Sequence, residues 1–322
     1  MSPEQRRRLH CALERTLDYL LGKQQHDGRW MDWKLPPGES SIWTTAYVGY
    51  RLKDLPAFLR KRTQPAMHTA SDWLLEQVFA DGGWGYSEQT GSDADSTALA
   101  VLFLAAEGKA VPATCYSFLQ TLQGPDGGFS TYPRSGIAGS WGVSHGDVTP
   151  TVVRALLTRY GRQAETIERG LDYVVKTQTS SGVWDSFWWT SFLYSTEASL
   201  ALTNDVGLKM DPAQTKATLL ASVCEGAFEK ALLLSSLLHL HPKRLDLETW
   251  RLINELLNDQ EGDGSWRSCS SLRVTRRDCF EPWRPGDSDT LFADTNRLFT
   301  TSTAIEALSR ACVLLDPPES GV

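Results

Sequence analysis

Amphipathic and wholly apolar stretches alternate along the chain. The amphipathic ones often end in glutamine: LDYLLGKQQ, DWLLEQ, YSFLQTLQ, LDYVVKTQ and INELLNDQ. Their apolar residues recur with helical spacing. Each is followed, after a loop, by a hydroxyl-rich start and a small apolar stretch: TTAYVGYRL, STALAVLFL, TPTVVRALL, STEASLALT and TSTAIEALS. Serine and threonine are favoured helix N-caps, so the pattern predicts pairs of helices, one amphipathic and one buried.

A glycine–aromatic turn separates the two helices of each pair. It reads DGRW at 27–30, DGGW at 81–84, DGGF at 126–129, SGVW at 181–184 and DGSW at 263–266, with EGAF at 225–228 as a degenerate copy. The spacing of about 40 to 55 residues is that of helical-pair repeats, and no segment shows sustained strand alternation. We expect Trp30, Trp84 and Trp266 to be structural, plugging the turns.

Six such helical hairpins have a natural closure, with the apolar helices inside and the amphipathic ones outside. The sequence therefore predicts an all-α fold, an (α/α)6 barrel or toroid. We expect a single barrel domain over residues 1–322, with a frayed tail at 316–322.

Two aspartates, Asp93 and Asp95, stand shortly before the very apolar run ALAVLFLAA at 98–106. Aspartate is a favoured N-cap, so capping alone is one interpretation. The inner helices align on shared threonines: Thr45, Thr97, Thr151, Thr196 and Thr303. In this alignment no sibling helix has a carboxylate at the position of Asp95, so we predict that Asp95 has a role beyond capping.

The starts of the inner helices should converge on one mouth of the barrel and line a common cavity. Besides the two aspartates, the candidate substrate-binding residues are Trp43, Tyr47, Ser96, His145, Asp147, Phe187, Trp188, Trp189, Tyr194 and Phe299. Burial and a like charge nearby raise the pKa of a carboxyl group. A protonated Asp95 could then act as a general acid at neutral pH, while aromatic faces would stabilise cations.

His145 and Asp147 precede the third inner helix in S-H-G-D-V-T-P. They could tune Asp95 by hydrogen bonding. The alternative for His145 is a solvated loop histidine.

Composition and charge restrict the partners. The net charge of −7 argues against nucleic acid. Six scattered cysteines without a C-x-x-C pair, and a start without the apolar core of a signal peptide, favour free thiols in the cytoplasm. The strongly apolar stretch at 231–240 is shorter than a membrane span. We therefore expect no stable membrane insertion. The sequence leaves the oligomeric state open.

The repeats resemble the QW repeats of squalene and oxidosqualene cyclases, whose barrel is shared by class II diterpene cyclases and protein prenyltransferase β subunits. Family members that protonate an alkene carry D-x-D-D-T-A, with the middle aspartate as the acid, and oxidosqualene cyclases carry D-C-T-A. The string S-D-A-D-S-T-A at 92–98 matches both motifs at Asp95, with Ser96 as the departure. The resemblance implies Asp95 as the catalytic acid, assisted by Asp93.

The resemblance also implies an enzyme, a class II terpene cyclase-like protein that starts the cyclisation of a hydrophobic, polyene- or isoprenoid-like substrate in natural-product biosynthesis. No cofactor is implied. Full-length relatives usually carry a second barrel, and these 322 residues have room for one, so the substrate could be smaller. A prenyltransferase-type zinc site is not expected, because Asp278-Cys279 has no histidine after it.

Other functions stay open. The chain could bind an isoprenoid without turning it over, or act as a subunit like the prenyltransferase β chain. It could also be a carbohydrate-active (α/α)6 enzyme, in which Asp147 would supply the second carboxylate. The acidic loop at 285–296 could be a lid or could attract a metal ion.

Overall fold

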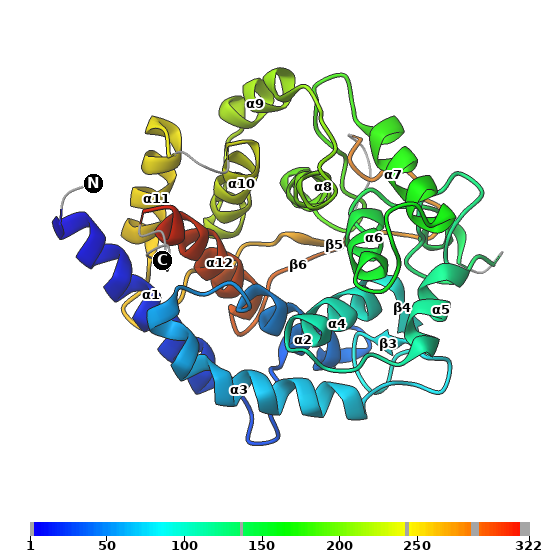
Figure 1. Ribbon diagram of the computed structural model, residues 1–322, viewed down its shortest axis with the longest axis horizontal. Helices are drawn as coiled ribbons and strands as arrows, with labels where there is room; N and C mark the ends of the chain where they lie inside the picture. Colours follow the sequence, from blue (N-terminus) through cyan, green and yellow to red (C-terminus); the bar gives the residue numbers. More distant parts are fainter. Residues whose placement is uncertain (1–2, 136–137, 242–244, 285–289, 316–322) are drawn as a thin grey trace.

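The helices form two concentric rings (Figure 1). The computed structural model describes residues 3–135, 138–241, 245–284 and 290–315. The outer helices are α1 (Pro3–Lys23), α3 (Ala57–Glu76), α5 (Ala113–Thr121), α7 (Glu165–Thr177), α9 (Pro212–Ala221) and α11 (Leu247–Asp259). The inner helices are α2 (Ile42–Arg51), α4 (Ala94–Ala106), α6 (Thr149–Leu157), α8 (Leu193–Asp205), α10 (Ala227–Leu240) and α12 (Leu298–Leu315). Each inner helix packs against the next, and α12 closes the ring against α2. The predicted all-α (α/α)6 barrel is confirmed.

Two expectations concern residues outside this description. The tail at 316–322 is one, and residues 285–289 of the acidic loop are the other. The assignment of residues 1–322 to a single domain stays a prediction.

The glycine–aromatic turn joins each outer helix to the following inner helix through hydrogen bonds that recur from repeat to repeat. The buried tryptophans Trp30, Trp84, Trp184 and Trp266 each donate Nε1–H to a carbonyl ten residues earlier, at 2.7–2.8 Å. Their backbone N–H groups donate to a threonine hydroxyl on the next inner helix. Since these tryptophans satisfy buried polar groups as well as filling space, the expected structural role of Trp30, Trp84 and Trp266 is confirmed.

The glycine of the turn lets the chain pass close to the next outer helix. Gly28 and Gly82 have φ of +99° and +89°, and a Cβ atom there would meet backbone atoms of α3 or α5 at 2.6–2.7 Å. Both features favour glycine. The glutamine at the end of the amphipathic stretch completes the turn, because the Gln24 side chain donates to the Gly28 carbonyl at 2.8 Å.

Three short antiparallel ladders stand near the starts of the inner helices. They pair β1 (Asp32–Leu35) with β2 (Gly38–Ser40), β3 (Trp84–Gly85) with β4 (Ser92–Asp93), and β5 (Leu272–Val274) with β6 (Thr290–Phe292). A 3-10 turn, η1, covers Gly139–Gly142. With two to four residues each, the strands are too short to give an alternation signal in the sequence.

Within the described part of the chain, α12 is the one helix that is long and apolar enough to cross a membrane by length and composition. Core helices of globular proteins meet the same criteria. Since 78% of α12 is buried inside the barrel, its apolar character is explained by its place in the inner ring.

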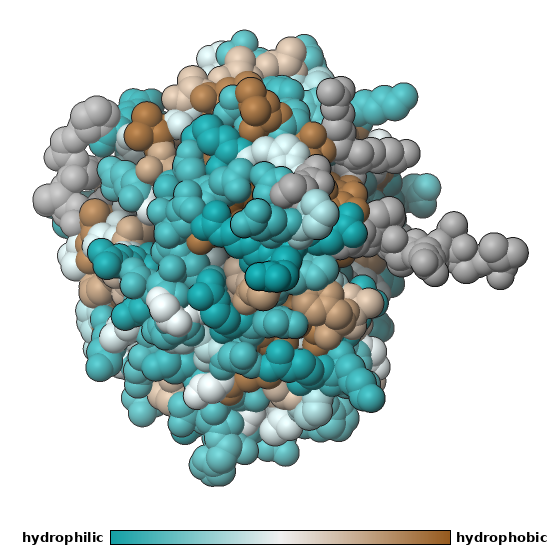
Figure 2. All heavy atoms as spheres, turned by 90° about the vertical axis from the view of Figure 1, so that its left-hand side faces the viewer, coloured by the Kyte–Doolittle hydropathy of each residue, from teal (hydrophilic) through white to brown (hydrophobic). Residues whose placement is uncertain are grey.

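The outer surface carries few large apolar side chains. Figure 2 shows the left-hand side of the view in Figure 1, where hydrophilic residues predominate and hydrophobic ones are scattered. Among the described outer helices none exposes more than one large hydrophobic residue: Phe58 on α3, Val175 on α7, Leu220 on α9 and Leu247 on α11. The exposed apolar stripe that a subunit-type partner would require is therefore not present on these helices.

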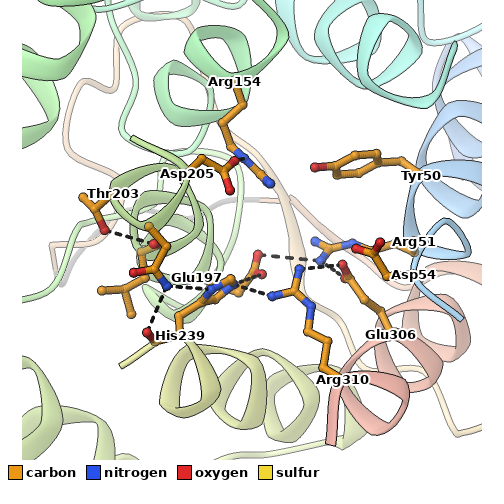
Figure 3. Close-up of polar contacts among 12 residues, drawn as sticks. Tyr50, Arg51, Asp54, Arg154, Glu197, Thr203, Asp205, His239, Glu306 and Arg310 are labelled. Carbon is orange, nitrogen blue, oxygen red and sulfur yellow. Dashed lines mark hydrogen bonds and ion pairs between the residues drawn. The ribbon is translucent and has the colours of Figure 1, made fainter. Parts of the chain in front are cut away.

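A network of buried charges lies between the inner helices (Figure 3). Glu306 of α12 pairs with Arg51 of α2 and, at 2.9 Å, with Arg310. Arg51 also lies 3.6 Å from Glu197 of α8, whose carboxylate contacts His239 of α10 at 3.3 Å. The charge of Arg51 overcomes burial and holds the pKa of Glu197 at about 2. Sequence patterning could have flagged these residues, since each is a charge inside an otherwise apolar predicted helix.

Candidate active site

A cavity of about 260 Å³ opens among the starts of the inner helices. Its walls are mostly aromatic and aliphatic, with three carboxyl groups among them. The lining residues are Leu35, Pro36, Pro37, Trp43, Tyr86, Thr90, Asp93, Asp95, Ser96, Thr131, Tyr132, Trp141, Asp147, Val148, Trp188, Trp189, Leu272 and Val274. Concave, largely apolar sites with a few convergent polar groups are typical of small-molecule binding.

Asp95 lies in the first turn of α4 and borders this cavity. Its Oδ2 accepts a hydrogen bond from Trp43 Nε1 at 2.6 Å, and its Oδ1 has no partner among the described residues. Burial, and then the neighbouring charge of Asp93, raises the pKa of Asp95 to about 8, against the opposing effect of the Trp43 hydrogen bond. Asp95 is therefore protonated at neutral pH, and its buried Oδ1 is not held by any of the described residues.

Asp93 is the N-cap of α4. Its Oδ1 accepts from the backbone N–H of Ser96 at 2.7 Å, and its Oδ2 accepts from the Ser96 hydroxyl at 2.8 Å. Burial raises its pKa to about 7. The capping interpretation thus applies to Asp93, whereas Asp95 caps nothing. Ser96, the departure from the family motif, is the residue that occupies both oxygens of Asp93.

Asp147 lines the cavity from the segment before α6. Its Oδ2 accepts from the backbone N–H groups of Phe187 and Trp188 at 2.9 and 2.7 Å. Its Oδ1, like that of Asp95, has no partner among the residues that the structure describes. Burial raises the pKa of Asp147 to about 6, with the hydrogen bond from Trp188 opposing.

The hydrogen bonds of the glycine–aromatic turns correct the alignment of the repeats. The residues that bond the turns are Thr45, Thr97, Thr149, Thr196 and Thr301, not Thr151 and Thr303. The alignment on Thr151 and Thr303 therefore placed the third and last inner helices two residues out of register. The premise that no sibling helix has a carboxylate at the position of Asp95 is wrong, because S-H-G-D-V-T at 144–149 aligns with S-D-A-D-S-T at 92–97 and places Asp147 there.

The corrected alignment gives one position that supplies much of the site. Two residues before each shared threonine stand Trp43, Asp95, Asp147, Tyr194 and Phe299. All five were among the candidates from the sequence, although the sequence alignment placed Asp147 and Phe299 elsewhere.

His145 does not hydrogen bond to Asp95, and it is not a solvated loop residue either. Its side chain is buried and stacks on Phe187 with ring centroids 4.0 Å apart. Its Nδ1 contacts the Thr131 hydroxyl at 3.0 Å and its Nε2 contacts the Ser140 carbonyl at 2.8 Å. Because burial lowers its pKa to about 4, His145 is a neutral residue that supports the cavity wall.

The predicted aromatic residues fall into two layers. Trp43, Trp188 and Trp189 border the cavity, whereas Tyr47, Phe187, Tyr194 and Phe299 lie behind them. Tyr47 stacks on Phe299 with ring centroids 3.8 Å apart, and Tyr194 stacks on Trp189 with ring centroids 4.3 Å apart. The second layer holds the rings of the first in place.

Sequence reasoning missed the lining residues contributed by loops and short strands. Pro36 and Pro37 come from the β1–β2 hairpin, and Leu272 and Val274 from β5. Such segments have no helical periodicity to place them. Trp33 was also missed; it has φ of +56° and packs against Trp43, Trp189 and Phe299.

No group of three or more His, Cys, Asp or Glu side chains in the described ranges is arranged to hold a metal ion.

The helical toroid matches the fold of the class II terpene cyclases. Residues 1–138 match the family model for the squalene-hopene cyclase C-terminal domain. An ent-copalyl diphosphate synthase from Streptomyces sp. (strain KO-3988) is 38% identical over 83 residues, which cover 26% of this chain and 15% of that protein. Drimenyl diphosphate synthase from Streptomyces showdoensis is 29% identical over 157 residues, covering 46% and 26%. The matched region thus spans only a minor part of these relatives.

A solved structure matches over its whole length. A single-residue variant of the type II terpene cyclase MstE from Scytonema, in an apo form, superimposes with a TM-score of 0.84 at 25% identity, covering 98% of this chain and 100% of that one. Another single-residue variant of MstE, in complex with geranylgeranyl dihydroxybenzoate as substrate, matches with a TM-score of 0.84 at 24% identity, covering 97% and 100%. The resemblance to squalene cyclases and class II terpene cyclases is confirmed.

Proposed function

We propose that this chain is a class II terpene cyclase-like enzyme in which Asp95 protonates an alkene of a hydrophobic, isoprenoid-like substrate and so starts its cyclisation. The observation that carries the proposal is a carboxylic acid, neutral at pH 7, that lines an aromatic cavity and whose buried Oδ1 has no partner among the described residues. MstE, whose described substrate is a geranylgeranylated aromatic acid, supports the same class of chemistry on the same fold.

The first step transfers the Asp95 proton to one carbon of a C=C bond. The π electron pair forms the new C–H bond and leaves a carbocation on the adjacent carbon, which a further C=C bond attacks to close a ring. Trp43, Trp188 and Trp189 line the cavity, and an aromatic face turned towards a cation stabilises it by about 0.5–2 kcal/mol. The start of α4 favours the carboxylate that remains after proton transfer, by about 0.3–1 kcal/mol.

The proposal requires no cofactor, and it leaves the substrate at the level of a class. The cavity volume of about 260 Å³ is just below the range of about 300–1,000 Å³ that is usual for drug-sized ligands. We therefore favour a compact isoprenoid in natural-product biosynthesis. The six cysteines, none of which forms a disulfide, support the expected cytoplasmic location.

The alternatives have less support. A β-subunit role would need an apolar docking face, and the described outer helices do not provide one. A sugar substrate would need many polar partners, whereas tryptophan, tyrosine, proline, leucine and valine side chains supply most of the cavity wall.

The test is incubation of the purified protein with a panel of linear isoprenoids, as free alcohols, diphosphates and prenylated aromatic acids, followed by product analysis. We expect a cyclic product from one of them, and a loss of about 10²-fold or more in Asp95→Asn. Asparagine keeps an oxygen for the Trp43 hydrogen bond and removes the acidic proton. Full turnover by Asp95→Asn, or binding without turnover by both proteins, would overturn the proposal.

A further inference from the structure

Asp95 and Asp147 form a matched pair of carboxyl groups on the cavity wall. They occupy the same position in neighbouring repeats, next to the neighbouring inner helices α4 and α6. Both line the cavity, and each has one oxygen held by the protein and a second, buried oxygen without a partner among the described residues. The acid at position 95 therefore has a counterpart that the initiation step does not use.

The two groups are held in different ways. Asp95 accepts one hydrogen bond, from an indole N–H, whereas Asp147 accepts two from consecutive backbone N–H groups. Hydrogen bonds of this kind stabilise the ionised form of a carboxyl group. The positive charge of Arg273 on β5 acts on Asp147 in the same direction. The geometry thus favours the acid form at Asp95 and the carboxylate form at Asp147.

We propose that Asp147 is the base that ends the reaction, with its Oδ1 accepting the proton that the last carbocation loses. The inference rests on the proposed cyclisation and names the residue that completes it. A C–H bond next to the cationic carbon breaks, its electron pair forms the C=C bond of the product, and the proton forms an O–H bond at Asp147. One proton enters the substrate from Asp95 and one leaves to Asp147, so the substrate is isomerised without oxidation or reduction.

The other candidate bases around the cavity are already engaged. Both oxygens of Asp93 accept hydrogen bonds from Ser96. Both ring nitrogens of His145 contact Thr131 and Ser140, and His145 does not border the cavity. Apart from Asp95 itself, which has just given up its proton, Asp147 is the lining carboxylate among the described residues whose Oδ1 has no hydrogen-bond partner.

The charged and titratable groups that face Asp147 set its pH behaviour. They are Arg273 of β5, Asp95 of α4, Tyr173 of α7 and Tyr194 of α8, with the neutral His145 nearby in the chain. The pKa of Asp147 is about 6 and that of Asp95 about 8. Between these values the acid and the base are both in the form that the reaction needs.

The test compares the products of Asp147→Asn with those of the wild-type protein on the substrate that the wild-type cyclises. Asparagine still offers an oxygen to the Phe187 and Trp188 N–H groups. We expect Asp147→Asn to go on consuming substrate, while the rate at which the normal alkene forms falls by about 10²-fold or more. Alkenes from loss of a different proton, or an alcohol from capture of water, should replace it. Asp147→Glu, which keeps a carboxylate, should restore part of the normal product.

Two controls make the outcome decisive. The first is Asp32→Asn. Asp32 is another buried carboxyl group that accepts hydrogen bonds from backbone N–H groups, those of Trp33, Asn296 and Leu298, but it does not line the cavity. This substitution should leave the product ratio unchanged. Because the charge of Asp147 raises the pKa of Asp95, Asp147→Asn should also lose activity at a lower pH than the wild type.

An unchanged product ratio in Asp147→Asn overturns the inference, and so does a loss of substrate consumption as complete as that in Asp95→Asn. Absence of any product from the wild-type protein would instead refute the proposed cyclisation itself.

Discussion

The properties of Asp95 are set by a small number of neighbours. Burial and the charges of Asp93 and Asp147 favour its neutral form, and the indole N–H of Trp43 favours its ionised form. The effects that favour the neutral form are the larger ones, so Asp95 keeps its proton at neutral pH. Local sequence could suggest the acid, because Asp95 fits the family motif, but the balance depends on contacts with residues 52 positions away in both directions.

The pH dependence of catalysis should report this balance. Activity is expected to fall as the pH rises through about 8, where Asp95 loses its proton. Trp43→Phe keeps an aromatic ring but removes the N–H that favours the carboxylate, so the pKa of Asp95 should rise and the alkaline limb of kcat/KM should move to higher pH. Tyr86→Phe, which alters another cavity residue without touching Asp95, is the control. A limb that stays in place, or moves to lower pH, would contradict the assignment of Asp95 as the acid.

Keeping this carboxyl buried should lower the stability of the folded protein. The pKa of Asp95 rises from about 4 in the unfolded chain to about 8 in the folded one. Between these values the folded state binds a proton that the unfolded state has released, so the contribution of Asp95 to the free energy of unfolding falls as the pH rises. It is fully present below pH 4 and lost by about pH 8.

Asp95→Asn should therefore gain stability relative to the wild type as the pH is raised from 4 to 8, by on the order of 5 kcal/mol. Urea unfolding at several pH values measures the difference. A difference that is constant over this range would show that Asp95 titrates alike in the folded and unfolded states.

At the scale of the elements, the recurring unit is the glycine–aromatic turn with its threonine. In the third repeat the backbone N–H of Phe129 donates to the Thr149 hydroxyl at 2.8 Å. Thr149→Val should leave this buried N–H without an acceptor and destabilise the protein by about 1–3 kcal/mol. Thr151→Val, two residues further along α6, makes the same chemical change away from the turn and should cost less. Chemical denaturation of both variants tests the corrected alignment, and equal losses would contradict it.

This pair of threonines also shows what the sequence could and could not predict. Helical periodicity and the repeated turns predicted the order of the helices and their arrangement in two rings, because each signal is local and recurs. The register of α6 and α12 could not be read in the same way. T-P-T at 149–151 and T-T-S-T at 300–303 each contain threonines two positions apart, and only the contact with the distant turn distinguishes them.

The residues that line the cavity also fall into those that the sequence could predict and those that it could not. Trp43, Asp95 and Asp147 could be predicted as lining residues because they lie at or just before the starts of inner helices. Pro36, Trp141 and Leu272 could not, since they lie in loops and short strands whose positions are fixed by packing across the mouth of the barrel.

At the scale of the whole molecule, the inner ring has two regions of opposite chemistry. The helix starts enclose an aromatic cavity with protonatable acids. Paired charges lie further along the helices, from Glu197 and Glu306 in the first halves of α8 and α12 to Arg51 and His239 towards the C-terminal ends of α2 and α10 (Figure 3). The two regions are linked through α2, which places Trp43 on the cavity and Arg51 in the network, with Tyr47 between them and 4.8 Å from the Arg51 guanidinium. The paired charges join helices that are far apart in the sequence and so help to keep the ring closed.

Glu306 is the anion on which this network depends, since it contacts Arg51, Lys53 and Arg310 while only 1% of its surface is exposed. Glu306→Gln removes its charge and leaves three cations with too few partners, which typically costs about 3–5 kcal/mol for a buried pair. The matched control is Asp205→Asn, which breaks the pair of Arg154 with a half-exposed aspartate at the rim and should cost about 1 kcal/mol or less.

In Glu306→Gln, Arg51 is no longer neutralised, so it should also lower the pKa of Asp95 and move the alkaline limb of activity to lower pH. Urea unfolding and the pH profile of both variants measure these effects, and a Glu306→Gln protein as stable as Asp205→Asn would show that the network does not hold the ring together.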